Sequence, residues 1–334
     1  MRGPHPAAYC AVVRDFFVKQ RTPLQVGLTA GVGAYVLWGV FPLYVNLLNP
    51  AQPVEIIAHR VVWSAVLCLG IIALARGWRA LAKVWARPRT LVLLGVASVL
   101  IATNWLVYIY GVQIGRVVDA SLGYYINPLF TVLLGVVVLR ERLRPVQWVA
   151  VGVGALAVVV IAVGYGQLPW ISLVLAGSFG LYGLLKNWVG RSVDALTGLA
   201  TETLLLTPLA VGYLVFLGAT SSLTFTQLGF WHALALFGTG AATAVPLLLF
   251  NASARRIPLS FMGLLQYIGP TLQLIIAVFV LGEEMPLSRW AGFGLVWLAL
   301  AIITIDGVHR RGVARAAQRA LAAAPLGGPV GGPA

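Results

Sequence analysis

Residues 91–114 read LVLLGVASVLIATNWLVYIYGVQI, an apolar run without a charged residue. A helix rises about 1.5 Å per residue, and the hydrocarbon core of a bilayer is about 30 Å thick, so roughly 20 apolar residues cross it. The run is long enough to meet this requirement. It therefore predicts a transmembrane helix.

The same length criterion finds nine further helices along the chain. Residues 145–185 are broken by the Gly- and Pro-containing stretch 164–169, and residues 203–254 are split by the polar loop 218–229. Each of these two intervals holds two helices, and the sequence predicts an all-α integral membrane protein. The ten expected helices lie near residues 25–46, 55–75, 91–114, 120–139, 145–163, 170–185, 203–217, 230–254, 257–282 and 287–306.

The composition excludes a water-soluble domain. Of the 334 residues, 60% are hydrophobic and 10% are charged, whereas soluble domains carry about 25% charged residues. A net charge of +14 would suggest a nucleic-acid partner in a soluble protein, but here the basic residues sit between apolar runs. The two cysteines, Cys10 and Cys68, are too far apart in the sequence to suggest a disulfide framework or a metal site.

The basic residues predict the orientation in the membrane. Lys and Arg concentrate in cytoplasmic loops, and with the N-terminus inside, 20 of the 23 basic residues fall in cytosolic segments. We therefore expect a multi-pass protein of the bacterial cytoplasmic (inner) membrane with both termini in the cytosol. The N-terminal tail, residues 1–24, lacks a cleavage-site pattern, and the C-terminal tail, residues 307–334, is expected to be disordered.

A short motif recurs in the two halves of the chain. The stretch Tyr125–Pro128 reads Tyr-Ile-Asn-Pro and recurs as Tyr-Ile-Gly-Pro at Tyr267–Pro270, and the same shift of 142 residues maps Glu141 onto Glu283. Each half then holds five helices, and because five is odd, the second half enters the membrane from the opposite side. Inverted repeats allow one fold to open alternately to either side, which is the basis of alternating access.

Four longer motifs resemble a known transporter family. They are Tyr35–Pro42 (Y-x-x-W-G-x-x-P), Glu55–Ser64 (E-x-x-x-H-R-x-x-W-S), Ala120–Leu129 (ASLGYYINPL) and Gln266–Thr271 (QYIGPT). Together they resemble the drug/metabolite transporter (DMT) superfamily and, within it, the RarD-type EamA transporters. The resemblance runs from residue 27 to residue 306 and omits only the tails.

The resemblance implies ten helices in two five-helix repeats, residues 25–163 and 167–306, and transport of small organic solutes. The chain departs from the family pattern at three charged positions. Arg140 stands before Glu141 where Gly is usual. Asp119 stands where Glu is usual, and Lys186 with Asn187 stands where an Arg-Lys pair is usual.

The length of the apolar run that follows Arg60 places this residue inside the membrane. The charge-free run that follows it, residues 61–75, is about 22 Å long at helical rise, so the second helix has to extend back through Arg60 and His59. Two interpretations of Arg60 are open: it reaches along the helix to the headgroups, or it faces the bundle and binds an anion or an acidic partner. His59 is either a proton-exchanging group or a hydrogen-bonded structural histidine.

Glu202 lies about two turns into the seventh expected helix, among apolar neighbours. An isolated carboxylate at this position suits a proton carrier, and a hydrogen bond to Lys186 or to a Ser or Thr hydroxyl is the structural alternative. Arg60 and Glu202 lie toward opposite faces of the membrane, so they need different partners. We expect Asp119 beside Arg60 near one face and Lys186 beside Glu202 near the other.

Further candidates for solute contact lie on the helices that carry the motifs. Aromatic side chains there either line a cavity for an aromatic or cationic solute or belong to the interfacial belt. These aromatic residues are Tyr35, Trp38, Trp63 and Trp105, and the polar amide candidates are Asn104, Asn127 and Gln266. Proline kinks helices, so the repeat mates Pro128 and Pro270 are expected bend points beside a central site.

The sequence favours a secondary transporter of a small organic solute, with the proton as a candidate coupling ion. A channel-like facilitator is the main alternative, because the repeat permits it equally, and a membrane-embedded enzyme is a more remote one. Neither a Walker motif nor a His-Glu-x-x-His zinc site is present, so we expect no enzyme, no cofactor and no metal. The expected partners are the solute, the lipid bilayer and protons, and no nucleic acid is expected.

Overall fold

The computed structural model describes residues 22–323, apart from 139, 141–142, 191–192, 258–261 and 263. Side chains are described as far as residue 306, except at 165 and 190. Glu141 and almost all of the predicted N-terminal tail lie outside the described residues. Within the described part the regular structure is helical, and no strand occurs there.

The helices follow the apolar intervals of the sequence. In chain order they are α2 (Pro23–Gly39), α3 (Phe41–Leu47), α4 (Pro53–Leu74), α5 (Trp78–Trp85), α6 (Pro88–Gln113), α7 (Val117–Val137), α8 (Pro145–Tyr165), α9 (Trp170–Gly190), α10 (Ala195–Ala219), α11 (Thr224–Gln227), α12 (Phe230–Ala254), α14 (Ile268–Ile275), the π-helix η1 (Ile276–Val280) and α15 (Leu287–Ala323).

Among the described residues, seven helices are long and apolar enough to cross a membrane: α4, α6, α7, α8, α10, α12 and the first part of α15. Together, α2 and α3 provide an eighth span, bent by 41° at the break between them. The two remaining expected spans correspond to α9 and to the shorter segment of α14 and η1. The predicted all-α multi-pass membrane protein is therefore confirmed.

The two prolines of the repeated motif occupy different positions in their helices. Pro128 lies inside the continuous helix α7. Pro270 lies in the first turn of α14, directly after a turn at Gln266 and Tyr267. A proline in a first turn removes no intrahelical hydrogen bond, so the chain breaks before Pro270 but continues through Pro128.

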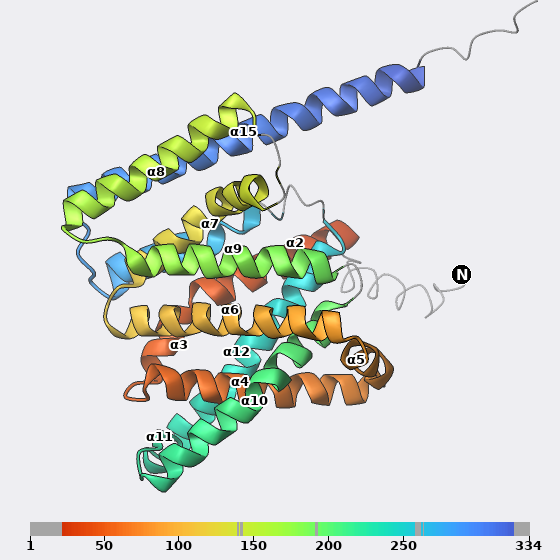
Figure 1. The fold of residues 1–334 in the computed structure, drawn as a ribbon. Helices are drawn as coiled ribbons and strands as arrows, with labels where there is room; N and C mark the ends of the chain where they lie inside the picture. The colour runs from red at the N-terminus through yellow and green to blue at the C-terminus, as the bar shows by residue number, and fades with distance from the viewer. Residues whose placement is uncertain are drawn as a thin grey trace, which may run out of the picture. The chain divides into compact units, whose positions relative to one another are not determined.

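The chain divides into two compact units. The first contains residues 1–121 and 182–283, and the second contains residues 122–181 and 284–334. In the first unit, α4 packs against α10 and α12, and α2 packs against α12 and α14 (Figure 1). In the second unit, α8 packs along α15.

Glycines allow close helix contacts in both units. A Cβ added at Gly240 in α12 would lie 2.5 Å from the carbonyl carbon of Trp63 in α4. In the second unit, a Cβ at Gly292 in α15 would lie 2.2 Å from a side-chain carbon of Ile161 in α8. Small residues at such points let membrane helices pack backbone to backbone.

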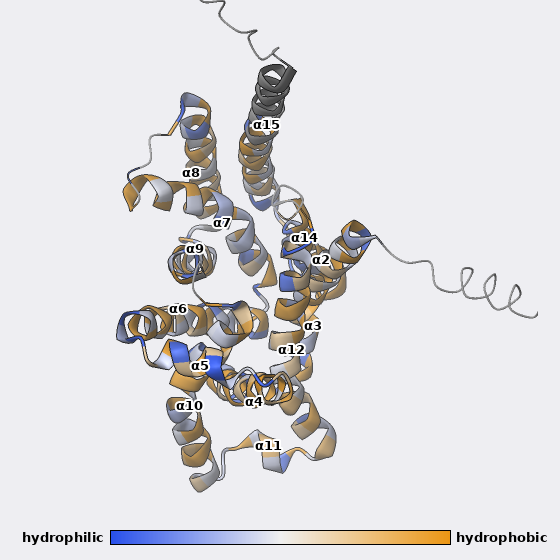
Figure 2. Ribbon diagram, turned by 90° about the vertical axis from the view of Figure 1, so that its right-hand side faces the viewer, coloured by the Kyte–Doolittle hydropathy of each residue, from blue (hydrophilic) through white to orange (hydrophobic). Residues whose placement is uncertain are grey.

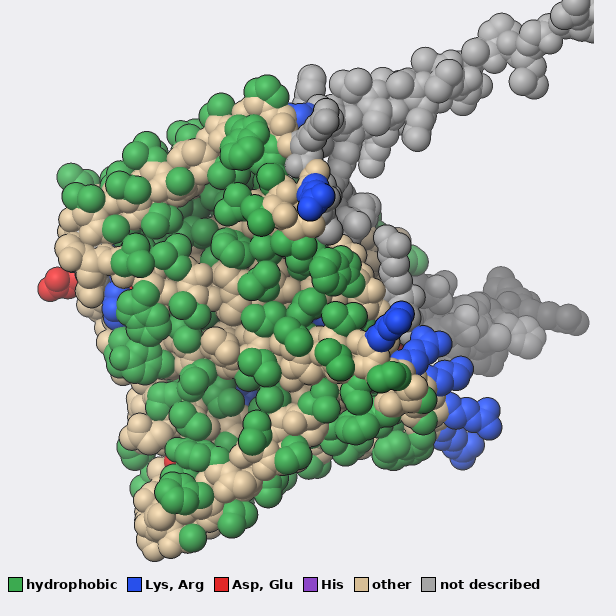
Figure 3. Space-filling view, viewed as in Figure 1, with side chains coloured by type: hydrophobic (Ala, Val, Ile, Leu, Met, Phe, Trp, Pro, Cys, Tyr) green, Lys and Arg blue, Asp and Glu red, His purple; other side chains and the backbone are tan. Residues whose placement is uncertain are grey.

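The face of the molecule seen in Figure 3 is largely apolar, and a group of basic side chains lies on it around α5. Hydrophobic residues cover much of the long helices (Figure 2) and of the face seen in Figure 3. In α5, Leu81 and Val84 are buried, whereas Arg79 and Lys83 are exposed, and basic side chains gather in this region in Figure 3. An apolar exterior interrupted by a basic amphipathic segment suits a protein surrounded by lipid.

The last helix is longer than the sequence predicts. It has 37 residues and ends at Ala323, whereas the expected disordered tail begins at residue 307. Within the second unit, Asp306 on α15 pairs with Arg144, the residue that precedes α8. Residues 324–334 lie outside the described part of the chain.

Candidate functional site

The helix that carries Glu202 begins at a well-formed cap. Asp194 accepts hydrogen bonds from the backbone N–H of Thr197 at 3.0 Å and from its hydroxyl at 2.6 Å. Burial disfavours ionisation of Asp194, but these hydrogen bonds outweigh it and hold the pKa of this carboxyl below its usual value. The cap begins α10 at Ala195, two turns before Glu202.

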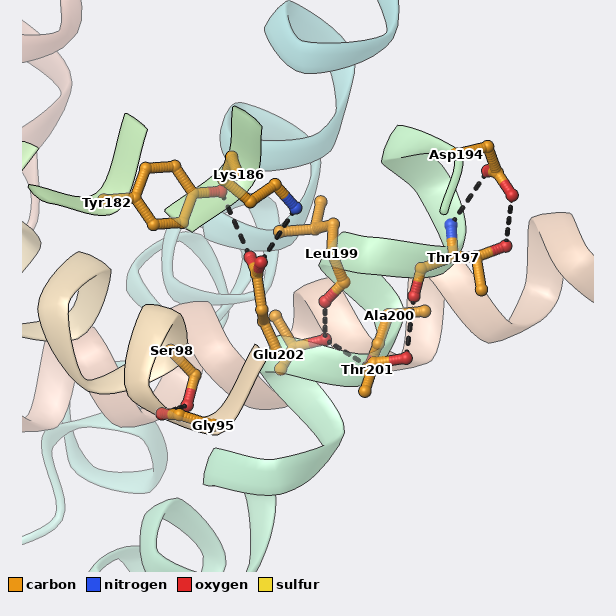
Figure 4. Close-up of polar contacts among 11 residues, drawn as sticks. Gly95, Ser98, Tyr182, Lys186, Asp194, Thr197, Leu199, Ala200, Thr201 and Glu202 are labelled. Carbon is orange, nitrogen blue, oxygen red and sulfur yellow. Dashed lines mark hydrogen bonds and ion pairs between the residues drawn. The ribbon is translucent and has the colours of Figure 1, made fainter. Parts of the chain in front are cut away.

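Glu202 is buried and bonded to two side chains of α9. It is 1% exposed, and its Oε1 lies 2.8 Å from Nζ of Lys186. The hydroxyl of Tyr182 donates to Oε2 at 3.1 Å (Figure 4). Because Tyr182 and Lys186 are four residues apart on one helix, both reach the same carboxylate. The expected Lys186–Glu202 pair is present.

The threonines near Glu202 bond to their own helix. Thr201 donates to the carbonyl of Thr197, and Thr203 donates to the carbonyl of Leu199, each at 2.8 Å (Figure 4). These hydroxyls therefore use their protons locally, a common arrangement for threonine within helices. The partners of the Glu202 carboxylate come from α9.

Arg60 lies inside the first unit, 5% exposed, among residues of three other helices. Its Nε donates to Oγ1 of Thr243 on α12 at 2.7 Å. Its Cζ lies 4.1 Å from the ring centroid of Trp105 on α6 and 4.8 Å from that of Phe41 on α3. Such stacking favours a cation over aromatic faces, so the side chain points into the helix bundle.

Two further buried polar residues, Ser64 and Asn104, lie on α4 and α6, the helices that carry Arg60 and Trp105. Ser64 lies one turn after Arg60 on α4 and is completely buried, and its Oγ has no hydrogen-bond partner among the described residues. Asn104 precedes Trp105 on α6 and is 1% exposed. Buried polar groups are normally hydrogen-bonded, so a hydroxyl without a partner among the described residues is an unusual feature of α4.

His59 faces a different neighbourhood from Arg60. Its Nδ1 accepts a hydrogen bond from the indole of Trp63 at 3.3 Å, and the ring of Phe225 stacks on it at 4.8 Å. A histidine that accepts at Nδ1 carries its proton at Nε2 when neutral. That Nε2 is buried and has no hydrogen-bond partner in the described part of the chain.

The short helix α11 is tied to the start of α4 by a buried carboxylate. Glu55 is 1% exposed and accepts from both the backbone N–H and the hydroxyl of Thr224, at 2.8 and 2.9 Å. The same hydroxyl lies 3.1 Å from Nε2 of His232. Thr224 and the neighbouring Phe225 thus hold the loop 218–229 against α4.

The remaining aromatic candidates form a separate cluster in the first unit. Tyr35 and Trp38 on α2 contact each other edge to face, with centroids 5.4 Å apart, and both contact Phe250 on α12. The carbonyl of Trp38 accepts a hydrogen bond from Gln273 on α14. Tyr35 and Trp38 therefore contribute to the packing of α2, α12 and α14.

Two carboxylates stand at the start of α7. Asp119 pairs with Arg116, three residues earlier, at 2.6 Å. Glu283 accepts from the backbone N–H groups of Val117 and Val118 at 2.5 and 2.8 Å, which stabilises the helix end. The expected pairing of Asp119 with Arg60 stays a prediction.

Asn127 lies in the second unit, on α7. Its Oδ1 is buried without a hydrogen-bond partner among the described residues. A Cβ added at Gly180 on α9 would lie 3.4 Å from this oxygen and 2.8 Å from the ring of Phe130, so the two helices approach closely there. Gln266, the last amide candidate, lies in the turn before α14 and is half-buried.

The sequence matches the model of the EamA-like transporter family twice, over residues 25–163 and 168–305. The chain belongs to the EamA-like transporter family. Protein RarD of Streptomyces exfoliatus is 47% identical to it, over 95% of this chain and 100% of that protein. An uncharacterized transporter of Vibrio cholerae is 41% identical, over 91% of this chain and 100% of its own length. The resemblance to RarD-type EamA transporters is confirmed.

The fold of this EamA-like transporter is also found in a solved crystal structure. That structure matches with a TM-score of 0.53 at 18% identity, over 86% of this chain and 99% of the other. At this identity the match shows a shared fold. Because the family and the relatives that the chain matches are described as transporters, the chain is a membrane transporter.

The EamA-like transporter contains functional candidates that the sequence did not reveal. They are Phe41, Ser64 and Thr243 around Arg60, Tyr182 on Glu202, and Glu55 with Thr224 at α11. Most are ordinary residues in apolar helices, and their partners lie far away in the sequence; Arg60 and Thr243 are 183 residues apart. For Tyr182 a local signal exists, because it lies one helical turn before Lys186 and so shares a helix face with it.

Proposed function

We propose that the chain is a secondary carrier that moves a small organic solute across the bacterial cytoplasmic membrane by alternating access. The buried charges inside its apolar helices are the main support. Arg60 and Glu202 are 5% and 1% exposed, and charges within membrane helices are costly and usually mark a transport pathway. Two family repeats, each expected to hold five helices, supply the inverted halves that alternating access uses.

The two charged clusters have separate roles in this proposal. Arg60, Asn104 and Trp105 contact the solute, because they gather polar and aromatic groups within the first unit. Lys186 and Glu202 form a pair that breaks and reforms as the carrier changes state, with Glu202 as the candidate proton carrier. A buried pair is suited to such a switch because breaking it is costly.

Glu202→Gln tests the proton role. Gln keeps the size and an acceptor for Tyr182 and Lys186 but cannot release a proton. We expect accumulation driven by a pH gradient to be lost in proteoliposomes, while exchange of solute across the membrane continues. Asp194→Asn is the matched control, since this carboxylate caps α10 outside the apolar span. Accumulation equal to that of the wild type in a well-folded Glu202→Gln protein rejects the proton role.

Counterflow separates a carrier from a channel. A metabolite screen of deletion and overexpression cells first identifies a transported solute. Proteoliposomes loaded with that solute are then given a labelled external supply. A carrier accelerates uptake of label through exchange, whereas a channel-like facilitator shows no such stimulation. Absence of trans-stimulation with a solute that the protein does transport rejects the carrier mechanism.

A further inference from the structure

The short helix α5 connects α4 to α6, both of which are long and apolar enough to cross a membrane. Its 8 residues extend about 12 Å at helical rise, which is too short for a span, so α5 lies at a membrane surface. Leu81 packs with Leu199 and Ala200 of α10, and Val84 packs with Leu94 of α6. These contacts hold α5 against α6 and α10.

Basic side chains follow one another through α5 and the residues on either side of it. They are Arg76, Arg79, Lys83, Arg87 and Arg89, and all of them are exposed. No acidic residue occurs between residues 76 and 89. Within the described part of the chain, none of these basic side chains forms an ion pair. Clusters of about four to eight basic residues on an amphipathic helix attract anionic lipid headgroups.

A cavity of about 320 Å³ lies where α5 meets the starts of α6 and α10. The side chains that matter for its chemistry are Ala80, Lys83, Arg87, Thr90, Asp194 and Thr197. Small-ligand sites have volumes of about 300 Å³ and more. The cavity is therefore large enough for a phosphate with its attached glycerol.

The polar groups that line this cavity suit a phosphate. Lys83 supplies an ammonium group and Arg87 a guanidinium group, which forms paired, charge-assisted hydrogen bonds with phosphate oxygens, and Thr90 adds a half-buried hydroxyl. Among the described residues that line the cavity, Asp194 is the one acid. Both of its oxygens accept hydrogen bonds from Thr197. The lining therefore carries more positive than negative charge.

Aromatic and apolar surfaces beside the basic cluster favour a lipid over a free anion. Trp78 and Trp85 are exposed at the two ends of α5, and tryptophan is enriched where headgroups meet hydrocarbon. Leu74 at the end of α4 and Val92 in α6 are also exposed. These two residues lie within one helical turn of the cluster along the chain and offer acyl chains an apolar surface.

We propose that this cavity binds the phosphate headgroup of an anionic phospholipid. Lys83 and Arg87 hold the phosphate, Thr90 donates to one of its oxygens, and the acyl chains lie on the exposed apolar surface of α4 and α6. The bound headgroup joins α5 to the start of α10. This inference does not depend on the carrier function, because it uses none of the residues assigned to the solute or the proton.

Matched lipids test this site. Purified full-length protein in a neutral detergent is titrated with dioleoylphosphatidylglycerol or dioleoylphosphatidylcholine, and native mass spectrometry counts the molecules bound. Both lipids have the same acyl chains and a phosphate, but the choline of the second neutralises its charge. We expect the first phosphatidylglycerol to bind at least tenfold more tightly than the first phosphatidylcholine. An equal concentration of inorganic phosphate, which has no acyl chains, should not displace it.

Charge variants then locate the headgroup. Lys83→Gln and Arg87→Gln should each weaken phosphatidylglycerol binding about fivefold, the usual effect of one basic residue beside an anionic lipid surface. Lys83→Arg keeps the charge and should retain binding. Arg140→Gln is the matched control and should leave binding unchanged, because Arg140 is exposed but belongs to the second unit.

A second pair of variants separates the cavity from a diffuse attraction to the basic surface. Ala80→Phe fills the cavity without changing any charge, because Ala80 lines it. Ala82→Phe adds the same ring at an exposed position of α5 outside the lining. We expect phosphatidylglycerol binding to fall at least tenfold in Ala80→Phe and to stay at the wild-type level in Ala82→Phe.

Four outcomes overturn the proposed lipid site. They are equal binding of the two lipids, displacement of phosphatidylglycerol by an equal concentration of inorganic phosphate, unchanged binding in both Lys83→Gln and Arg87→Gln, and equal binding in Ala80→Phe and Ala82→Phe. The first two comparisons use the wild-type protein, so a variant that folds poorly does not affect them.

Discussion

Replacing Lys186 by Met probes how much the buried ion pair stabilises the first unit. Met retains most of the side-chain length but leaves the Glu202 carboxylate with the hydroxyl of Tyr182, 3.1 Å away. Removing one partner of a buried pair costs about 3–5 kcal/mol. Lys186 is itself 25% exposed at its side chain, whereas Glu202 is 1% exposed. We therefore expect the lower end of this range, about 3 kcal/mol.

Two companion variants provide stability losses with which the loss in Lys186→Met can be compared. In Glu202→Gln the uncompensated group is the partly exposed ammonium of Lys186, which can turn toward water, so we expect a cost of about 1 kcal/mol. Tyr182→Phe removes one neutral donor, and hydrogen bonds between membrane helices are worth about 0.6 kcal/mol on average. The double variant Lys186→Met with Glu202→Gln should recover much of the loss, because it removes both charges.

Unfolding in mixed micelles, followed by circular dichroism, measures these differences in stability. Each loss appears as a shift in the detergent fraction at the midpoint of unfolding. The order of loss should be Lys186→Met, then Glu202→Gln, then Tyr182→Phe. A double variant that is less stable than Lys186→Met alone, or a Tyr182→Phe loss as large as that of Lys186→Met, would refute the desolvation reasoning.

Other tests address packing, capping and topology. Gly240→Ala places a Cβ 2.5 Å from the Trp63 backbone, whereas Gly212 in α10 has no atom within 4 Å of such a Cβ; thermal unfolding should show a loss of several degrees for Gly240→Ala and none for Gly212→Ala. Asp194→Ala removes the cap of α10 and should cost about 1 kcal/mol at pH 7. Because the pKa of Asp194 is lowered in the folded state, this stabilisation is present above the ordinary carboxyl pKa. It is lost as the pH falls through the lowered value, so titration of wild type and variant should converge in acid, and a pH-independent gap would argue against the cap. A cysteine at Ser222 should react with an impermeant thiol reagent from outside intact cells, and one at Ala80 should not; the reverse pattern would reject the predicted orientation.

Much of the fold could be predicted from the sequence because a membrane helix is specified locally. Every backbone hydrogen bond of a helix is made within a few residues, and the bilayer sets the required apolar length. The span 91–114 and its counterparts needed no further information. The Lys186–Glu202 pair could also be predicted from the sequence, because two isolated charges near the same end of neighbouring spans have few other partners.

The surroundings of Arg60 and the docking of α11 were decided by tertiary structure. In water, the buried face of a helix is recognised by its apolar stripe. In a bilayer, both the lipid-facing side and the packed side are apolar, so periodicity does not show which face is buried. Neither Phe41 nor Thr243 carries a signal that directs it to Arg60, and nothing local links Thr224 to Glu55, 169 residues away. The sequence determined that a charge lies within the membrane, and the packing of α3, α4, α6 and α12 determined what surrounds it.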